Sequence, residues 1–97
     1  MASERLLLIS ECCKHYSVEY SFISALKASR LISVIEIDRQ EFLPQEELEK
    51  MERISRLYHE LEINLEGIEA ILPLLQKVEE LQQEIAELKN RLRLFEE

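Results

Sequence analysis

Residues 65–95 read LEGIEAILPLLQKVEELQQEIAELKNRLRLF, and they carry the strongest single pattern in the chain. Apolar residues recur in it alternately every three and every four positions, which is the heptad pattern of a helix that pairs with a second helix. β-branched residues predominate at one heptad position and Leu at the other, a combination that favours two strands. We therefore predict a dimerisation helix with a continuous apolar seam. The seam residues are Ile71, Leu74, Val78, Leu81, Ile85, Leu88, Leu92 and Phe95.

The charges beside the seam favour a parallel pair. Glu84 would face Lys89 of a second helix, and Arg91 would face Glu96. The repeat is short, so the same stripe could instead fold back on the rest of the chain; we favour dimerisation over that alternative. Pro73 lies inside the stretch and removes one backbone hydrogen bond, so we expect a kink or a loosened turn there.

Composition and charge limit the classes of function. The chain has 97 residues with a net charge of −8, and it contains one Gly and two Pro. So few turn formers, together with abundant Leu, Ile and Glu, indicate a mainly helical protein. The excess acid lies in residues 44–97, which hold fourteen Asp/Glu against seven Lys/Arg. This balance argues against non-specific nucleic-acid binding and favours a partner with a basic surface.

The cysteine pattern indicates a reducing compartment. Cys12 and Cys13 are adjacent, and a disulfide between neighbours would be strained, so we expect free thiols. Neither a secretory signal pattern nor an apolar stretch of membrane-spanning length is found in the sequence. We therefore expect a cytoplasmic protein that does not associate with a membrane.

The first half of the chain predicts two short helices followed by a hairpin. Apolar spacing favours a helix from about Leu8 to His15, and then a second helix at residues 19–30 with Ser17 as its N-cap. The β-branched residues at 34–37 and the apolar pair at 42–43 flank a polar segment, as in a short wing. Helix, turn, helix and wing form the outline of a DNA-binding domain.

The second half predicts one helix before the seam helix. Pro44 favours a helix start, and the acidic residues that follow it suit the N-terminal end of the helix dipole. Asn64 is a suitable N-cap for the last helix, and Gly67 would allow close packing of the backbone.

No constellation of residues for catalysis or metal binding emerges. Cys12 and His15 could face one metal ion, but a closed zinc site needs four ligands and no second pair is suitably spaced. One Gly in the whole chain offers little for an oxyanion-hole loop. We therefore expect neither an enzyme nor a protein that carries a cofactor or a metal.

The residues of the expected DNA-reading surface are poorly suited to phosphate. The second helix offers only Lys27 and Arg30 as cations. In the wing, Arg39 is opposed by three acids. These acids are Glu36, Asp38 and Glu41. A helix-turn-helix fold of this composition favours a protein partner over nucleic acid.

Residues 56–68, RLYHELEINLEGI, followed by the heptad helix, resemble the CbpM-type chaperone modulators, whose domain is similar to that of MerR regulators. The resemblance implies a MerR-like winged helix-turn-helix domain at residues 1–64 and a coiled-coil helix at residues 65–97. MerR-type dimers cross their long helices antiparallel, so the direction of the pair stays open.

The resemblance also implies a function. Proteins of this family bind the J-domain of a DnaJ/CbpA-like co-chaperone and keep it from working with its DnaK-type chaperone. An acidic surface would suit the basic helix of a J-domain. We expect an acidic partner-binding surface in which Arg56 and His59 act as polar organisers. The acidic residues are Glu46, Glu47, Glu49, Glu52, Glu60 and Glu62.

Three alternatives remain open. The first is a MerR-like transcription regulator that binds DNA through Lys27, Arg30 and Arg39. The second is a coiled-coil adaptor with no link to chaperones. The third is a thiol or metal sensor that uses Cys12, Cys13 and His15.

Overall fold

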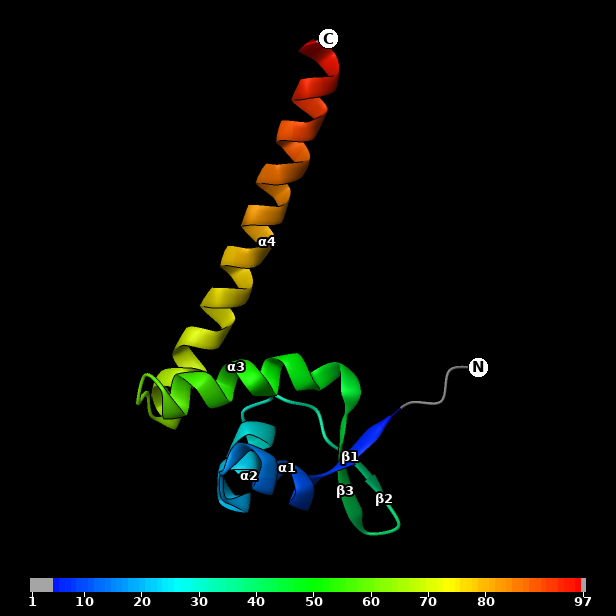
Figure 1. The fold of residues 1–97 in the computed structure, drawn as a ribbon, viewed down its shortest axis with the longest axis vertical. Helices are drawn as coiled ribbons and strands as arrows, with labels where there is room; N and C mark the ends of the chain where they lie inside the picture. The colour runs from blue at the N-terminus through cyan, green and yellow to red at the C-terminus, as the bar shows by residue number, and fades with distance from the viewer. Residues whose placement is uncertain (1–4, 97) are drawn as a thin grey trace.

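The computed structural model describes residues 5–96, which form a small globular part and one long protruding helix (Figure 1). This arrangement confirms the mainly helical fold and the long C-terminal helix. The elements in chain order are β1 (Leu6–Leu8), α1 (Ile9–Tyr16), α2 (Tyr20–Ala28), β2 (Ile35–Ile37), β3 (Gln40–Pro44), the 3₁₀ turn η1 (Gln45–Glu47), α3 (Leu48–His59) and α4 (Leu65–Glu96).

Helices α1 and α2 form the predicted helix-turn-helix, but the turn differs from the expected one. Ser17 ends α1 in the left-handed conformation, with φ of 54°. The backbone N–H of Val18 then donates to the Cys13 carbonyl oxygen at 3.0 Å. The prediction that Ser17 caps the second helix is wrong, because Glu19 holds the N-cap position and its side chain makes no capping bond with the described residues. The two helices still follow one another across three residues.

The predicted hairpin is present, and it belongs to a three-stranded antiparallel sheet of order β1-β3-β2. Asp38 and Arg39 connect β2 to β3, both with positive φ, as two-residue hairpin turns require. Strand β1 pairs with the other edge of β3, with Leu7 opposite Leu43. This pairing ties the start of the chain to the wing.

Helix α3 begins later than the sequence suggested. Pro44 is the last residue of β3, and a three-residue 3₁₀ turn separates it from Leu48. The N–H of Gln45 donates to the Arg5 carbonyl oxygen at 2.9 Å, which extends the pairing of β1 with β3. The expected helix start at Pro44 is therefore displaced by one short turn.

Two local features shape the joint between α3 and α4, and a third contact ties the end of α3 to α1. The Asn64 side-chain oxygen accepts a hydrogen bond from the Gly67 N–H at 2.8 Å, which confirms Asn64 as the N-cap. A Cβ atom on Gly67 would lie 2.6 Å from Cγ2 of Ile63, so the close packing of the Ile63 side chain on Gly67 favours glycine there. At the end of α3, Nε2 of His59 donates to the Tyr16 carbonyl oxygen at 2.8 Å and ties α3 to α1.

One hydrophobic core joins these elements, and the first turns of α4 contribute to it. Ile68 and Leu72 are buried together with residues of α1, α2, β3 and α3. The other buried apolar residues are Ile9, Cys12, Tyr16, Val18, Ile23, Leu26, Ile32, Leu43, Met51, Ile54 and Leu57.

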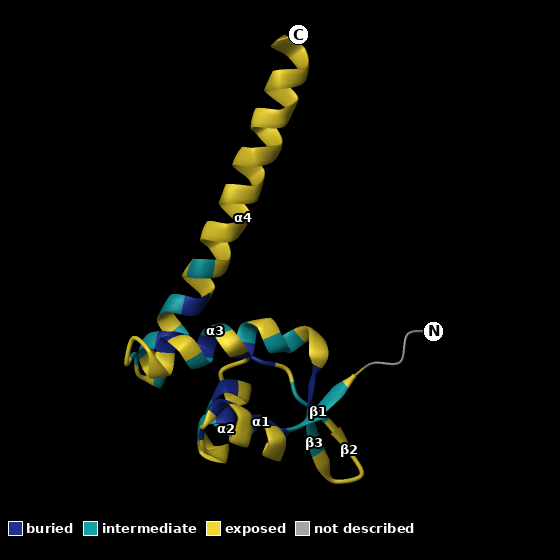
Figure 2. Ribbon diagram, in the orientation of Figure 1, coloured by how far each residue is buried: buried dark blue, intermediate teal, exposed yellow. Residues whose placement is uncertain are grey.

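Beyond the core, α4 is an isolated arm. The helix continues through Pro73 to Glu96, and every described residue after Leu75 is exposed (Figure 2). Val78, Glu79 and Gln82 line a groove beside α3. Beyond Gln82, the described residues of the arm are exposed and do not fold back on the globular part. The alternative in which the seam folds back on the domain is therefore not the arrangement of this chain.

The burial of Ile68 predicts that α4 and the globular part unfold together. Replacing Ile68 with Ala should lower the free energy of unfolding by about 2–5 kcal/mol, because it removes buried methyl groups from a packed core. Leu94→Ala is the matched control, since Leu94 is 77% exposed, and its effect should stay within about 0.5 kcal/mol. Urea unfolding followed by circular dichroism measures both values; equal effects would contradict this account of the core.

Candidate functional site

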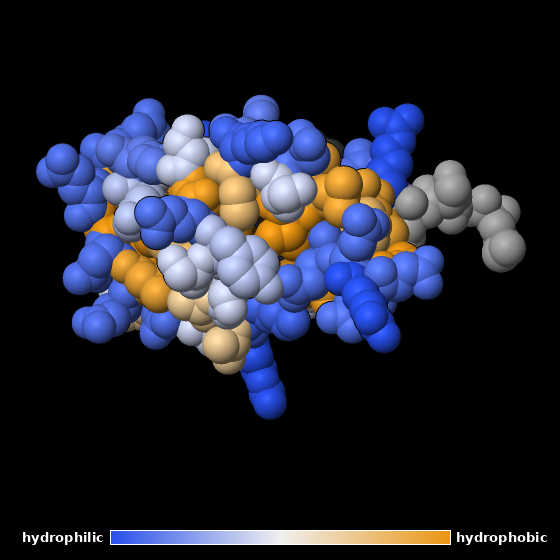
Figure 3. Space-filling view, turned by 90° about the horizontal axis from the view of Figure 1, so that it is seen from below, coloured by the Kyte–Doolittle hydropathy of each residue, from blue (hydrophilic) through white to orange (hydrophobic). Residues whose placement is uncertain are grey.

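The exposed stripe of α2 is the surface that a helix-turn-helix would present to a partner. Tyr20, Ser24 and Lys27 lie on it, spaced four and three residues apart, and all three are exposed. Figure 3 shows the globular part from below, where hydrophilic side chains surround smaller hydrophobic areas. This stripe and the wing are the parts of the fold that the helix-turn-helix outline assigns to recognition.

The side chain of Glu41, on β3, contacts this stripe of α2. Its Oε2 lies 2.9 Å from Nζ of Lys27, and its Oε1 accepts a hydrogen bond from the Tyr20 hydroxyl. One carboxylate thus binds both ends of the exposed stripe of α2. The hydrogen bonds from Tyr20 and Lys27 hold the pKa of Glu41 below its usual value, so the carboxylate is charged at neutral pH. The only cation within the α2 helix itself is consequently neutralised by the wing.

The seam of α4 is the second candidate surface. Ile71 packs partly against the core, whereas the other seven seam residues are exposed. Their exposed fractions run from 45% for Leu81 to 90% for Phe95. A row of apolar side chains this long has no counterpart among the described residues of the same chain. Surfaces of this kind usually bind another protein.

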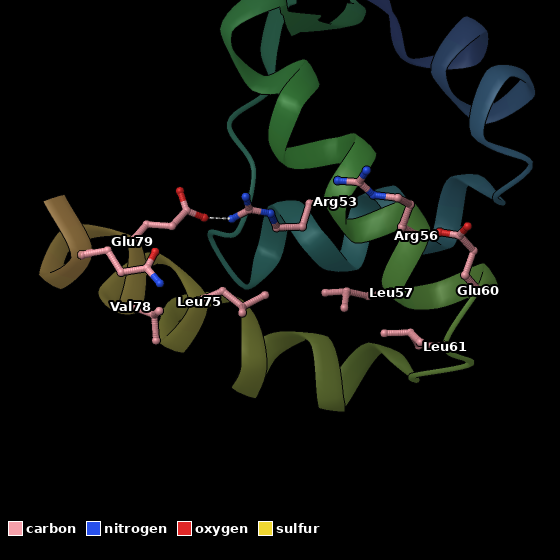
Figure 4. A pocket seen from close by; sticks show the side chains of 9 residues that line it. Arg53, Arg56, Leu57, Glu60, Leu61, Leu75, Val78 and Glu79 are labelled. Carbon is pink, nitrogen blue, oxygen red and sulfur yellow. Dashed lines mark hydrogen bonds and ion pairs between the residues drawn. The ribbon is translucent and has the colours of Figure 1, made fainter. Parts of the chain in front are cut away.

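A groove between α3 and α4 adjoins the seam (Figure 4). Leu57 and Leu61 line it from the α3 side, and Leu75 and Val78 line it from α4. An ion pair between Arg53 and Glu79 connects the two helices at the groove. Because Val78 belongs to both the groove and the seam, a helix that covers the seam would pass beside the groove.

The predicted acidic residues fall into two groups. Glu46, Glu49 and Glu52 are exposed on η1 and α3. Glu60 and Glu62 are exposed at the turn that joins α3 to α4. The structure thus places five carboxylates on the surface of α3 and of the turns before and after it.

Glu47 differs from the other predicted acids because it has internal partners. Its Oε1 accepts a hydrogen bond from the Ser33 N–H at 2.6 Å, and its Oε2 lies 3.6 Å from Nζ of Lys50. The residue is half-buried, so it fixes the loop before β2 to the start of α3.

The two predicted polar organisers have different surroundings. His59 contacts the Tyr16 carbonyl oxygen, as described above, so its ring organises the joint between α1 and α3. Arg56 is exposed and lines the α3–α4 groove.

Sequence reasoning missed two features of these surfaces. The first is the contact of Glu41 with α2, which joins residues 14 and 21 positions apart. The second is the packing of Phe22 on Tyr58, whose ring centroids lie 4.5 Å apart. Neither has a local signal, since only the fold brings the partners together.

The residues of the thiol or metal sensor alternative do not converge on a site. Cys12 and Cys13 are free thiols, and Cys12 is fully buried in the core. His15 is exposed and its ring packs edge-on against Tyr16. Within residues 5–96, no three His, Cys, Asp or Glu residues are grouped so that they could hold a metal ion.

In the described part of the chain, no helix has both the length and the apolar character that crossing a membrane would require.

The fold and its two surfaces define a class: a winged helix-turn-helix protein with a long C-terminal helix whose apolar seam is exposed. The model of the MerR HTH family regulatory proteins matches residues 7–90, and the chain belongs to this family. Comparison with curated proteins and with solved structures gave no match.

The surroundings of Cys12 predict an unreactive thiol. Burial, followed by the neighbouring Cys13, raises the pKa of Cys12 from 9.0 to about 11. At pH 9, iodoacetamide should therefore alkylate Cys12 much more slowly than it does in urea, and more slowly than Cys13, since the thiolate is the nucleophile. Mass spectrometry of Cys12→Ser and Cys13→Ser variants separates the two sites, and a fast reaction at Cys12 would contradict its burial.

The same shift sets a pH dependence of stability. Between pH 9 and about 11 an unfolded chain loses the Cys12 proton while the folded chain keeps it, so stability falls as pH rises through this window.

Proposed function

We propose that this protein is a non-enzymatic, homodimeric modulator that binds the J-domain of a DnaJ/CbpA-like co-chaperone and inhibits its cooperation with a DnaK-type chaperone. The observation that carries the proposal is the sequence at residues 56–68, which resembles that of CbpM-type modulators. In the fold this segment forms the end of α3, where His59 contacts α1, and the α3–α4 joint, where Asn64 contacts Gly67. The resemblance therefore covers residues that shape the joint and not only exposed ones.

The charge distribution supports a basic protein partner. Glu46, Glu49 and Glu52 project from one end of α3, and Glu60 and Glu62 lie at its other end. Attraction between such a surface and the basic helix of a J-domain would raise the association rate and orient the two proteins. Exposed carboxylates of this kind gain little from partners in their own chain, so they are available to a second protein.

The proposed dimer rests on the seam of α4. A helix that places Leu74, Leu81 and Leu88 in water loses the free energy that their burial would provide, about 1.5–3 kcal/mol for each fully buried Leu. A second copy of α4 presents the same apolar row and would cover it. The charges beside the seam favour a parallel pair, whereas MerR-type dimers cross their long helices antiparallel. The proposed dimer is compatible with either direction.

A J-domain binding experiment tests the proposed function. The isolated J-domain of a co-chaperone encoded in the same genome should bind the full chain, and binding should weaken as salt is raised, because exposed charges are screened. The triple variant E46Q/E49Q/E52Q should weaken binding about tenfold, which equals about 1.4 kcal/mol. Calorimetry or surface plasmon resonance gives both values.

The matched control changes three carboxylates on the arm. Glu80, Glu87 and Glu96 are exposed on the arm, away from the α3–α4 joint, so E80Q/E87Q/E96Q alters the net charge equally. This control should bind the J-domain as the unchanged chain does. If the unchanged chain does not bind at low salt, the proposal fails; if both triple variants weaken equally, the α3 surface is not the site.

Light scattering tests the dimer separately. The unchanged chain should have twice its 11.5 kDa mass, and L81E/L88E should have the mass of one chain, since paired carboxylates cannot be buried in an apolar seam. Leu94→Glu is the control, because Leu94 lies off the seam and should leave the dimer intact. A monomeric unchanged chain at micromolar concentration would refute the assignment of the seam.

The family membership favours a second candidate, a transcription regulator that binds DNA through α2 and the wing. It predicts that the unchanged protein shifts a palindromic duplex at low salt through Lys27, Arg30 and Arg39. The neutralisation of Lys27 by Glu41 counts against it.

A further inference from the structure

We infer that Glu41 is the specificity-determining residue of the helix-turn-helix face, and that its carboxylate keeps this face from binding the phosphates of duplex DNA. DNA binding is an activity that this fold could support and that one wing residue suppresses. It does not depend on the identity of the protein partner proposed above.

The geometry places Glu41 where a phosphate would have to sit. Lys27 is the cation of the exposed α2 stripe, and its Nζ lies 2.9 Å from Oε2 of Glu41. Any phosphate oxygen that approached Nζ would also approach the carboxylate. Attraction to one unit charge and repulsion from another at nearly equal distance almost cancel. Lys27 therefore adds almost nothing to the attraction of a phosphate while Glu41 remains charged.

The second carboxylate oxygen removes a further donor. The Tyr20 hydroxyl donates to Oε1 of Glu41, so it is turned toward the wing. Hydroxyl and ammonium groups on a recognition helix are common donors to the DNA backbone. Glu41 thus engages the two strongest donors of the exposed stripe and leaves Ser24 between them.

The other charges of this face indicate that Glu41 accounts for a large share of the suppression of phosphate binding. Lys14, Arg30 and Arg39 are exposed, and within residues 5–96 none of them forms an ion pair. Glu36 also acts on Lys27 through its charge, although it makes no direct contact with it in the described structure. With Glu41 neutral, these three cations and Lys27 would face Glu36 and Asp38 as the remaining acids of the wing, and Lys27 is the cation on the helix stripe.

The wing does not need the Glu41 contacts to fold. Lys27 is exposed, and exposed ion pairs contribute little to stability. Strand β3 is held instead by its pairing with β1 and β2 and by the buried side chain of Leu43. Glu41→Gln keeps the shape of the side chain and an oxygen that can accept the Tyr20 hydrogen bond, so it removes the charge with little other change.

Fluorescence anisotropy with a labelled duplex of mixed sequence tests the inference. At low salt, Glu41→Gln should bind about tenfold more tightly than the unchanged chain, and its salt dependence should be steeper by about one phosphate contact. Glu41→Thr, which suits a strand, should show the same gain. Circular dichroism verifies that both variants are folded.

Two further variants decide between a local effect and a general one. Glu87→Gln changes the net charge equally on the arm and should gain no DNA binding. E41Q/K27M should return to the weak binding of the unchanged chain, because the freed cation is gone. The inference is overturned if Glu41→Gln gains nothing, if Glu87→Gln gains as much, or if the double variant keeps the gain.

Discussion

The rest of the structure depends on the packing of the first two turns of α4 into the core. Ile68 and Leu72 are almost completely inaccessible and belong to the same core cluster as residues from both helices of the helix-turn-helix and from α3. A chain of this size buries a modest core, so the loss of either residue would remove a large part of it. Asn64 caps the helix that carries them, and Gly67 permits its close approach to Ile63. The direction of the arm is therefore set by the core and not by a flexible linker.

Because the core holds the first turns of α4, the seam has a fixed position relative to the globular part. The apolar row begins at Ile71, which already touches the core, and continues without interruption along the exposed arm. A second helix laid on the row would reach the groove beside α3, since Val78 lines both surfaces. Pairing of the arms and the position of the globular parts are consequently linked. Any change that reorients α4 in the core would also reorient the two recognition surfaces of a dimer relative to each other.

The sequence predicted those parts of the fold whose signals are local. The heptad predicted the arm, the Asp38–Arg39 segment lay between two apolar runs, and Asn64 stood before a long periodic stretch. The predicted helix starts were wrong at two positions where the chain adopts a different local structure. Ser17 ends one helix in the left-handed conformation instead of starting the next, and a 3₁₀ turn follows Pro44 because that residue is paired in β3. The roles of Glu41 and Glu47 could not be predicted, because each depends on a residue brought close only by the fold.

The contrast between these two glutamates explains how an acidic chain can keep a fold associated with regulation. Glu47 supports the fold itself, since it accepts the Ser33 N–H and is half-buried. Glu41 is different, because the sheet register and Leu43 hold its strand whether or not the carboxylate is present. Its contacts with Tyr20 and Lys27 therefore affect recognition far more than stability. A helix-turn-helix frame constrains where the recognition helix lies, but a single wing residue can determine which charge that helix presents. The partner class of such a protein is thus set by a small number of exposed side chains that the core does not constrain.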